Sequence, residues 1–278
     1  MINFTENYFD LRLLKITDVK LHEDTENKRL RNIFQRISDD NYLMNPVIVG
    51  KYDDDYILID GANRFSSLKE IGCKLILAQI IDYKDKEIKL YSWNHFVYEL
   101  EAETILALAR KKKYKIEETN FRSGRKTVNS GINKILVSDI ENNKHYVITF
   151  ENNFEKILKG LFEFTRLYTG KYNFDRSESD IKIEELKKYS RKKGILIDFP
   201  DFKKEHIVKI ARKKLKIPTG ISRHILKNRV LHVKYALKNL KDTNNLEKKR
   251  EDLSKYLYKK IDDNKVRQYK ESVIIFDE

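Results

Sequence analysis

The sequence Asp60-Gly61-Ala62-Asn63-Arg64 follows the apolar run over residues 56–59 and precedes a helical pattern over residues 65–71. A strand that passes through Asp-Gly into a helix N-terminus predicts an anion site, because the first N–H groups of the helix are unpaired and carry the positive end of its dipole. Gly61 lets the backbone approach a ligand closely, and Arg64 adds donors that fit phosphate oxygens. Asp60 ends the strand, where it can meet a metal ion or a hydroxyl. Such turns also occur as plain connectors.

The residues on either side of this turn predict a small α/β unit. Residues 11–21 read as a strand and its approach, Thr25 is a candidate cap for a helix over residues 27–39, and residues 46–49 and 56–59 flank a hairpin turn at Asp53-Asp54-Asp55. The helix over residues 65–71 ends at Gly72, and residues 75–81 form a further strand. The first hundred residues therefore read β-α-β-β-α-β.

The rest of the chain predicts a mixture of helices and strands without repeats. We expect helices over residues 93–112, 154–168, 204–215 and 246–263, and strands over 135–140, 145–150, 195–197, 229–233 and 272–276. Residues 122–130 are polar and basic, which is typical of an exposed loop. We therefore expect an N-terminal α/β domain over residues 1–100 and a C-terminal α+β domain over residues 101–278.

The composition indicates a cytoplasmic protein with a polar surface. The 278 residues include 57 Lys and Arg against 43 Asp and Glu, which gives a formal charge of +14. This charge favours contact with nucleic acid, but acidic residues are interleaved with the basic ones and no binding motif accompanies them. Cys73 is the single cysteine, so an intrachain disulfide is excluded, and we expect it to be a buried residue without a catalytic role. We find no signal-peptide pattern and no run long enough to span a membrane.

Three further places contain residues that suit chemistry. Glu23 follows a strand and can act as a general base on a hydroxyl, although a solvent-facing acid in a loop fits the same pattern. Trp93, the single tryptophan, fits a core or boundary aromatic, and the neighbouring His95 fits either a structural histidine or a ligand. The turn Pro218-Thr219-Gly220-Ile221-Ser222-Arg223-His224 offers N–H groups, hydroxyls and a guanidinium to a small carboxylate, or it is an ordinary polar turn.

Taken in order, these segments resemble the free L-serine kinases with a ParB/sulfiredoxin-like fold. The resemblance rests on Leu21-His22-Glu23, on the segment Ile59 to Lys69 that contains the Asp-Gly turn, on Trp93, on the Pro218 to His224 cluster, and on the closing segment Tyr269 to Phe276. It covers nearly the whole chain. The Asp-Gly turn alone is shared across the fold superfamily, whereas its combination with the later cluster is specific.

The resemblance implies phosphoryl transfer from ADP or ATP, with Mg²⁺, to the hydroxyl of free L-serine, giving O-phospho-L-serine. Glu23 matches the base and Asp60 the aspartate that assists the base or the metal. Gly61, Ala62, Asn63 and Arg64 match the phosphate-holding turn, with Asn63 standing where a histidine is usual. Trp93, Thr219, Ser222, Arg223 and His224 match the serine pocket, where Arg223 would pair with the serine carboxylate.

Other activities of the same fold are weighed against this one. Sulfiredoxins have a cysteine in the phosphate turn, which this chain lacks. ParB partition proteins have an arginine-rich turn and a helix-turn-helix, which are not evident here. A nucleotide-binding and DNA-binding regulator without kinase turnover stays the alternative, and some relatives also bind haem. The donor, ADP or ATP, and the pathway, synthesis of cysteine or of a siderophore, stay open.

Overall fold

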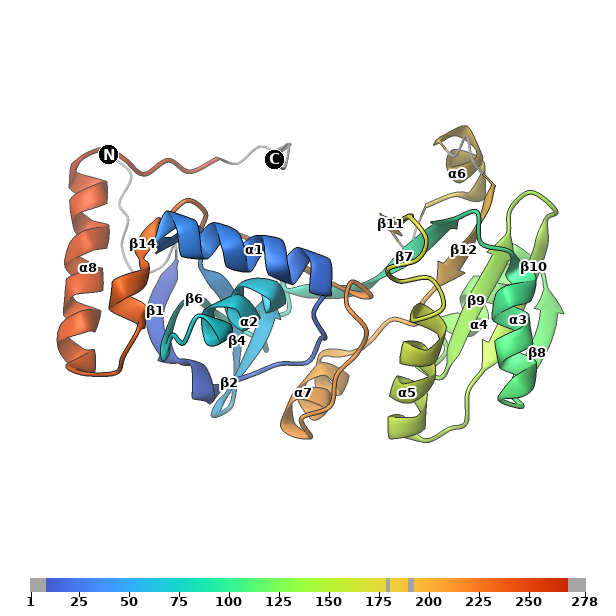
Figure 1. The fold of residues 1–278 in the computed structure, drawn as a ribbon. Coiled ribbons are helices and arrows are strands. Elements are labelled where there is room, and N and C mark those ends of the chain that lie inside the picture. Colours follow the sequence, from blue (N-terminus) through green and yellow to red (C-terminus); the bar gives the residue numbers. More distant parts are fainter. Residues whose placement is uncertain (1–8, 179–180, 190–192, 270–278) are drawn as a thin grey trace.

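The computed structural model describes residues 9–178, 181–189 and 193–269, and it is a mixed α/β structure with two main sheets (Figure 1). The predicted mixed α/β class is confirmed. The expected strand over residues 272–276, and the closing segment used in the resemblance beyond Tyr269, lie outside the described residues. No helix in the described part of the chain is long and apolar enough to cross a bilayer.

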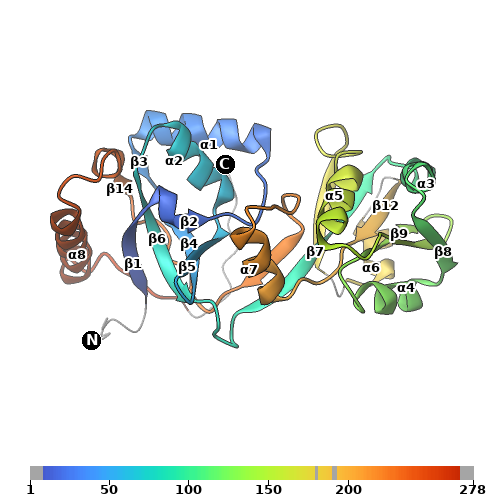
Figure 2. The same cartoon turned by 90° about the horizontal axis from the view of Figure 1, so that it is seen from below.

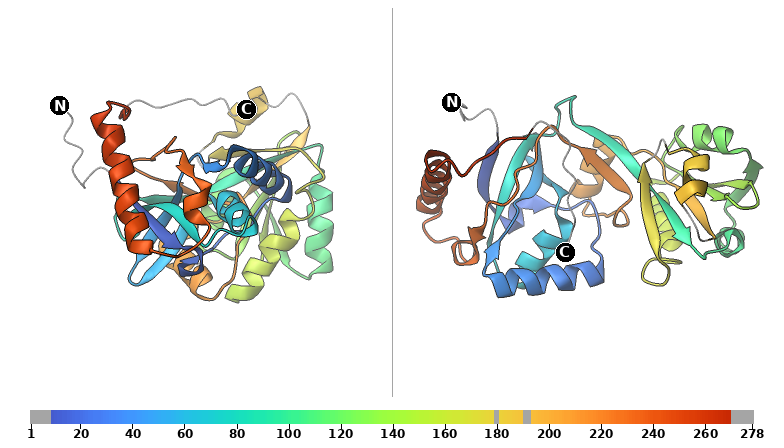
Figure 3. Two further views of the ribbon diagram at one scale, coloured as in Figure 1. Left: turned by 60° about the vertical axis from the view of Figure 1, so that its left-hand side comes forward. Right: turned by 90° about the horizontal axis from the view of Figure 1, so that it is seen from above.

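The first sheet has five strands in the order β1-β6-β4-β5-β2. These are β1 (Asp10–Lys15), β2 (Val19–Lys20), β4 (Val47–Tyr52), β5 (Asp55–Asp60) and β6 (Leu75–Asp82). β4 and β5 form the predicted antiparallel hairpin, while β2 runs parallel to β5. The helices α1 (Asn27–Asp40) and α2 (Ala62–Glu70) lie together on one side of this sheet (Figure 3). The predicted β-α-β-β-α-β order is therefore present.

The second sheet has seven strands, and the long strand β7 (Lys89–Tyr98) links it to the first part of the molecule (Figure 2). The path β11-β7-β12-β9-β10-β8 is antiparallel throughout, and β13 (Ser222–Ile225) pairs with the first half of β7. The other strands are β8 (Lys115–Thr119), β9 (Lys134–Asp139), β10 (Lys144–Thr149), β11 (Phe174–Glu178) and β12 (Gly194–Asp198). The helices of this part are α3 (Ala102–Lys111), α4 (Phe121–Val128), α5 (Phe154–Thr165), α6 (Ile183–Tyr189) and α7 (Lys204–Arg212).

The chain returns to the first sheet at its C-terminal end. β14 (Tyr235–Ala236) pairs with β3 (Tyr42–Leu43), and the helix α8 (Leu246–Asp262) packs beside β1. Val233, Leu240 and Leu253 are buried in the same apolar core as the first sheet. The boundary near residue 100 stays a prediction, and this packing adds that residues from the last fifth of the chain complete the first core.

The predicted helix over residues 93–112 is wrong over residues 93–101, because β7 extends to Tyr98 and α3 begins only at Ala102. Residues 94–97 are buried on both faces of the strand, so they lack the alternation that marks a half-buried strand. Glu99, with a φ of +60°, separates the strand from the helix. A strand buried on both faces thus has a helix-like pattern in the sequence.

Three smaller expectations are also wrong. Residues 121–128 form the helix α4, which the Asn120 side chain caps. Gly124 lies within this helix at a position where a Cβ would be only 2.6 Å from Leu136 Cδ1, so the packing requires a glycine there. Residues 229–233 form no strand, and the strand of this region is β13. Thr25 does not cap α1, whose N-cap is Glu26 without a side-chain bond.

Candidate active site

The Asp-Gly turn has the geometry that the sequence predicts. β5 ends at Asp60, Gly61 is the N-cap residue with a φ of +98°, and α2 begins at Ala62. A Cβ on Gly61 would lie 2.8 Å from Arg64 Nη2 and 2.9 Å from Val47 Cγ1, so only glycine fits this turn without strain. The residues of the first turn of α2, whose N–H groups have no partner within the helix, line the cavity.

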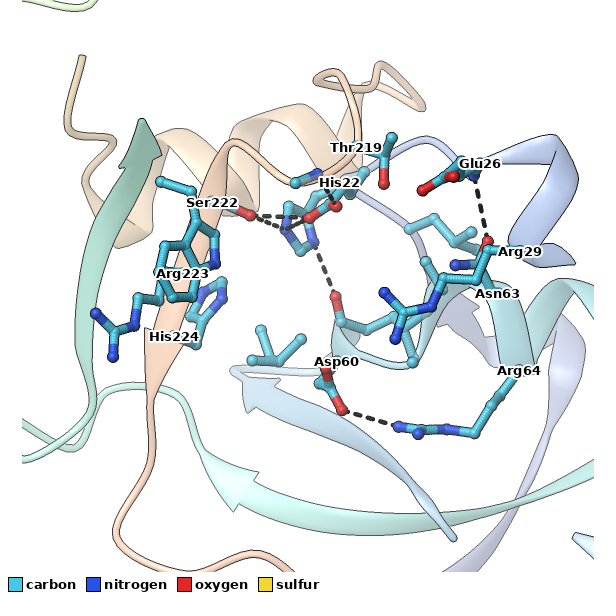
Figure 4. A pocket seen from close by; sticks show the side chains of 18 of the residues that line it. His22, Glu26, Arg29, Asp60, Asn63, Arg64, Thr219, Ser222, Arg223 and His224 are labelled. Atoms are coloured by element: carbon cyan, nitrogen blue, oxygen red, sulfur yellow. Dashed lines mark hydrogen bonds and ion pairs between the residues drawn. The ribbon is translucent and has the colours of Figure 1, made fainter. Parts of the chain in front are cut away.

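Cations surround Asp60 at this turn. Its carboxylate forms an ion pair with Arg64 at 2.8 Å (Figure 4) and a second with Arg229 at 3.2 Å. The Nε of Arg64 is buried and has no partner among the described residues. Asn63 accepts a hydrogen bond from the Glu26 N–H at 3.3 Å through its Oδ1, which leaves its amide N–H groups as donors. One carboxylate therefore faces two guanidinium groups and a helix N-terminus.

Glu23 lies in the same cavity and is held by the Pro218 to His224 segment. Its Oε1 accepts from the Gly220 N–H at 2.6 Å, and its Oε2 accepts from the Ser222 hydroxyl at 2.9 Å. Burial raises the pKa of the Glu23 carboxyl, while these hydrogen bonds and the charge of Arg176 act in the opposite direction. Its side chain is 19% exposed. Glu23 is therefore a fixed, mostly buried carboxylate with one edge open to a ligand.

Two buried histidines support this side of the site as neutral groups. The Nδ1 of His22 lies 2.8 Å from the Leu58 carbonyl oxygen, and burial lowers the His22 pKa to about 4, so its Nδ1–H donates to that carbonyl. His224 Nε2 lies 2.8 Å from the Tyr83 hydroxyl, and burial likewise lowers its pKa. The sequence predicts His224 as part of the pocket, which it lines, but it does not predict His22.

Trp93 and Arg223 form a stacked pair at the edge of the cavity. The Arg223 guanidinium lies 4.3 Å from the centre of the Trp93 ring and pairs with Glu178 at 2.5 Å. In Figure 4 the Arg223 side chain points away from Asp60 and Arg64. Arg223 therefore contacts the Trp93 ring and the Glu178 carboxylate, whereas the sequence suggests a guanidinium that is free to bind a ligand carboxylate.

The cavity has a volume of about 520 Å³, within the range of small-molecule sites. All eleven residues predicted from the sequence line it, including Thr219, and they come from four separate segments of the chain. It also contains residues that the sequence does not single out, because no local motif marks them: His22, Glu26, Arg29, Arg176 and Arg229.

No group of three or more His, Cys, Asp or Glu side chains that could hold a metal occurs among residues 9–178, 181–189 and 193–269. Mg²⁺ in nucleotide sites needs only one or two carboxylates, because phosphate oxygens and waters complete its shell. Asp60, beside the turn, meets that smaller requirement. The residues present fit a metal that arrives with a nucleotide.

Comparison with solved structures identifies the fold. The chain superposes on SbnI with a C-terminal truncation from Staphylococcus aureus with a TM-score of 0.69, 18% identity, and coverage of 90% of this chain and 97% of that one. It also superposes on a free serine kinase in complex with AMP with a TM-score of 0.68, 17% identity, and coverage of 83% and 93%. The chain has the free serine kinase fold.

Sequence comparison finds relatives over a shorter span. An ATP-dependent L-serine kinase from Staphylothermus marinus is 32% identical over 83 residues, which is 29% of this chain and 33% of that protein. An ADP-dependent L-serine kinase from Thermococcus kodakarensis is 26% identical over 86 residues, or 30% and 36% of the two chains. The match thus spans about a third of the length of these relatives. No family model matches the sequence.

Proposed function

We propose that the protein is a free L-serine kinase that transfers a phosphoryl group from ATP or ADP to the serine hydroxyl and forms O-phospho-L-serine. The observation that carries this proposal is the position of the Glu23 carboxylate, fixed by Gly220 and Ser222 in the same cavity as the Gly61 to Arg64 turn. The names of the sequence relatives support it. The fold supports it as well, since the chain also superposes on a glutamate-to-alanine variant of a free serine kinase in complex with ADP.

The donor side of the proposed reaction is the turn at α2. The N–H groups of the first helical turn, Arg64 and Asn63 would bind the nucleotide phosphates, and Arg229 adds a second guanidinium beside them. Mg²⁺ would be held by Asp60 and the phosphates and would supply neutralisation of phosphate charge. Phosphoryl transfer depends mainly on such positioning and charge neutralisation, which this side can provide.

The acceptor side is the segment that holds Glu23. The serine hydroxyl would donate to Glu23 and lose its proton to that carboxylate as its oxygen bonds to the terminal phosphorus, while the bond from that phosphorus to the leaving nucleotide breaks. The leaving product would be ADP where ATP is the donor, and AMP where ADP is the donor. The Trp93 ring, with Arg223 stacked on it, would form one side of the serine pocket. Thr219 and Ser222 would offer hydroxyl groups to the serine, and His224 would complete the lining.

The experiment that tests this function is a product assay. The purified chain is mixed with L-serine, Mg²⁺ and either ATP or ADP, and phosphorus NMR is used to detect O-phosphoserine. Product from one nucleotide supports the kinase and identifies the donor. Absence of product with both, while nucleotide binds, contradicts the kinase and favours a nucleotide-binding regulator, which a salt-dependent gel shift with DNA would then test.

The wider role follows from the product. We place the activity in the cytoplasm, where O-phosphoserine would serve synthesis of cysteine or of a siderophore. The assay above does not depend on which of these two uses applies.

A further inference from the structure

Arg176 lies behind the segment that holds Glu23. It belongs to β11 and is paired in register with His95 of β7. An ideal Cβ built on Gly220 would lie 2.2 Å from Arg176 Nη2, 2.4 Å from Nε and 2.5 Å from Cζ. The guanidinium therefore packs flat against the α-carbon of Gly220, the residue whose N–H binds Glu23.

Arg176 acts on the Glu23 carboxylate through its charge, but it forms no ion pair with a carboxylate in the described part of the chain. No Asp or Glu there lies within ion-pair distance of it, and its Nε is buried without a hydrogen-bond partner. Arg176 is one of the residues that line the cavity. A partly buried cation with an unused donor is costly unless an anion pairs with it, so this arrangement favours an anionic ligand.

The other arginines of the cavity are engaged or lie at the donor side. Arg64 and Arg229 pair with Asp60, and Arg223 pairs with Glu178. Arg29 lies beside Asn63 in Figure 4, at the phosphate turn. Near Glu23, Arg176 is thus the guanidinium that is available to a ligand.

We propose that Arg176, rather than Arg223, binds the α-carboxylate of the acceptor amino acid and so makes the site specific for an amino acid over a plain amino alcohol. This inference rests on the proposed function. In serine the hydroxyl and the carboxylate stand on adjacent carbons. A molecule whose hydroxyl contacts Glu23 can therefore reach a cation that packs on Gly220, the neighbour of that carboxylate. The guanidinium fork matches a carboxylate with two parallel hydrogen bonds.

The transferred phosphoryl group is the competing anion for Arg176. The donor side already has Arg29, Arg64, Arg229 and the N-terminus of α2. The acceptor side has no other unpaired guanidinium among the described residues that line the cavity. The distribution of charge thus favours the carboxylate.

The test compares L-serine with 2-aminoethanol, which has the hydroxyl and the amine but no carboxylate. Steady-state rates are measured for the wild type, Arg176→Gln, Arg176→Lys and the control Arg110→Gln, which changes an exposed arginine of α3 that pairs with Glu103. We expect Arg176→Gln to raise the KM for L-serine about 10- to 100-fold, as loss of a charge-assisted pair implies. The KM for nucleotide should change less than about twofold. The kcat/KM for 2-aminoethanol should fall less than that for L-serine, because both acceptors share the effect of Arg176 on Glu23 and only L-serine loses the carboxylate contact. Arg176→Lys should recover part of the loss.

Binding is measured separately from turnover through the fluorescence of Trp93, the single tryptophan of the chain. Titration with L-serine should give tight binding in the wild type and weak binding in Arg176→Gln, with 2-aminoethanol weak in both. Equal losses for both acceptors, or a raised KM for nucleotide, would overturn the inference in favour of contact with the phosphoryl group. Serine binding without turnover in the wild type would refute the kinase while the binding comparison still decides the role of Arg176.

Discussion

Replacing Gly220 by alanine tests whether the Arg176 guanidinium and the Glu23 partner are packed as described. Gly220 has a φ of +74°, and its added methyl would meet Arg176 Nη2 at 2.2 Å. Gly170 has a φ of +76° and nothing within 4 Å of the same methyl position. The two substitutions therefore share the backbone cost and differ in what the methyl group meets.

The expected losses follow from these two contributions. An L residue in the left-handed region costs roughly 1–2 kcal/mol, and Gly170→Ala should lose about that much free energy of unfolding. Overpacking adds about 1–3 kcal/mol, because the guanidinium must move and few positions are open to it. Gly220→Ala should therefore lose roughly 2–5 kcal/mol. Movement of the Gly220 N–H away from Glu23 should also lower kcat about 10- to 100-fold, while Gly170→Ala leaves kcat unchanged.

A double-mutant cycle isolates the collision. Urea unfolding is measured for Gly220→Ala and Gly170→Ala in the wild type and in Arg176→Ala, where the guanidinium is absent. In that background Gly220→Ala should cost no more than Gly170→Ala, which corresponds to a coupling of about 1–3 kcal/mol between the two sites. If Gly220→Ala costs the same with and without the guanidinium, the packing of Arg176 on this turn is refuted.

Three further outcomes are expected. Glu23→Gln should abolish formation of O-phosphoserine and keep nucleotide affinity within about threefold in a nucleotide titration, whereas the exposed control Glu247→Gln should keep full activity; retained turnover in Glu23→Gln would exclude the base. The pKa of buried His22, lowered to about 4, means that the unfolded chain binds more protons between pH 6.5 and 4, so the free energy of unfolding should fall by about 3 kcal/mol over that range from His22 alone. Urea unfolding of His22→Gln at pH 7 and 4.5 should show a smaller fall, and an unchanged fall would contradict the assignment. Gln79 binds the Asn228 carbonyl and the Val230 N–H on either side of Arg229, so Gln79→Leu should weaken nucleotide binding more than serine binding; the reverse order would separate Arg229 from the phosphates.

The sequence predicts best where local chemistry determines the structure. The hairpin turn at Asp53-Asp54-Asp55 and the α1 helix follow from turn residues and helical spacing, and both are present within one or two residues. The sequence predicts a helix over the second half of β7 because residues 94–97 are buried on both faces, so their pattern depends on strands β11 and β12, which pair with them. Tertiary pairing, which no local pattern contains, determines that element.

The same limit applies to the site. The phosphate turn is contiguous, and its glycine and arginine mark it in the sequence. Arg176 and Arg229 have no such signal, since one is a single residue of a strand and the other lies in a connection placed by the side chain of Gln79. Glu23 and Gly220 meet although they stand nearly 200 positions apart. Their contact depends on the short backbone ladder that joins His22 and Asp24 to Ile217.

The register of the first sheet explains why Glu23 and Asp60 reach the same cavity. β2 and β5 are parallel, with Val19 opposite Tyr56 and Lys20 opposite Ile57, an offset of 37 residues. The same offset of 37 joins Glu26 to Asn63 and Leu30 to Ser67 through hydrogen bonds between the α1 and α2 segments. Glu23 and Asp60 are also 37 residues apart, and each lies between a strand and a helix or at the end of that strand. Parallel strands bring their carboxyl ends to one edge, so the segment after β2 that contains Glu23 and the turn after β5 lie at the same edge of the sheet. The β2–β5 pairing thus aligns the two segments, and the backbone ladder to Ile217 holds Glu23 in place beyond the end of β2.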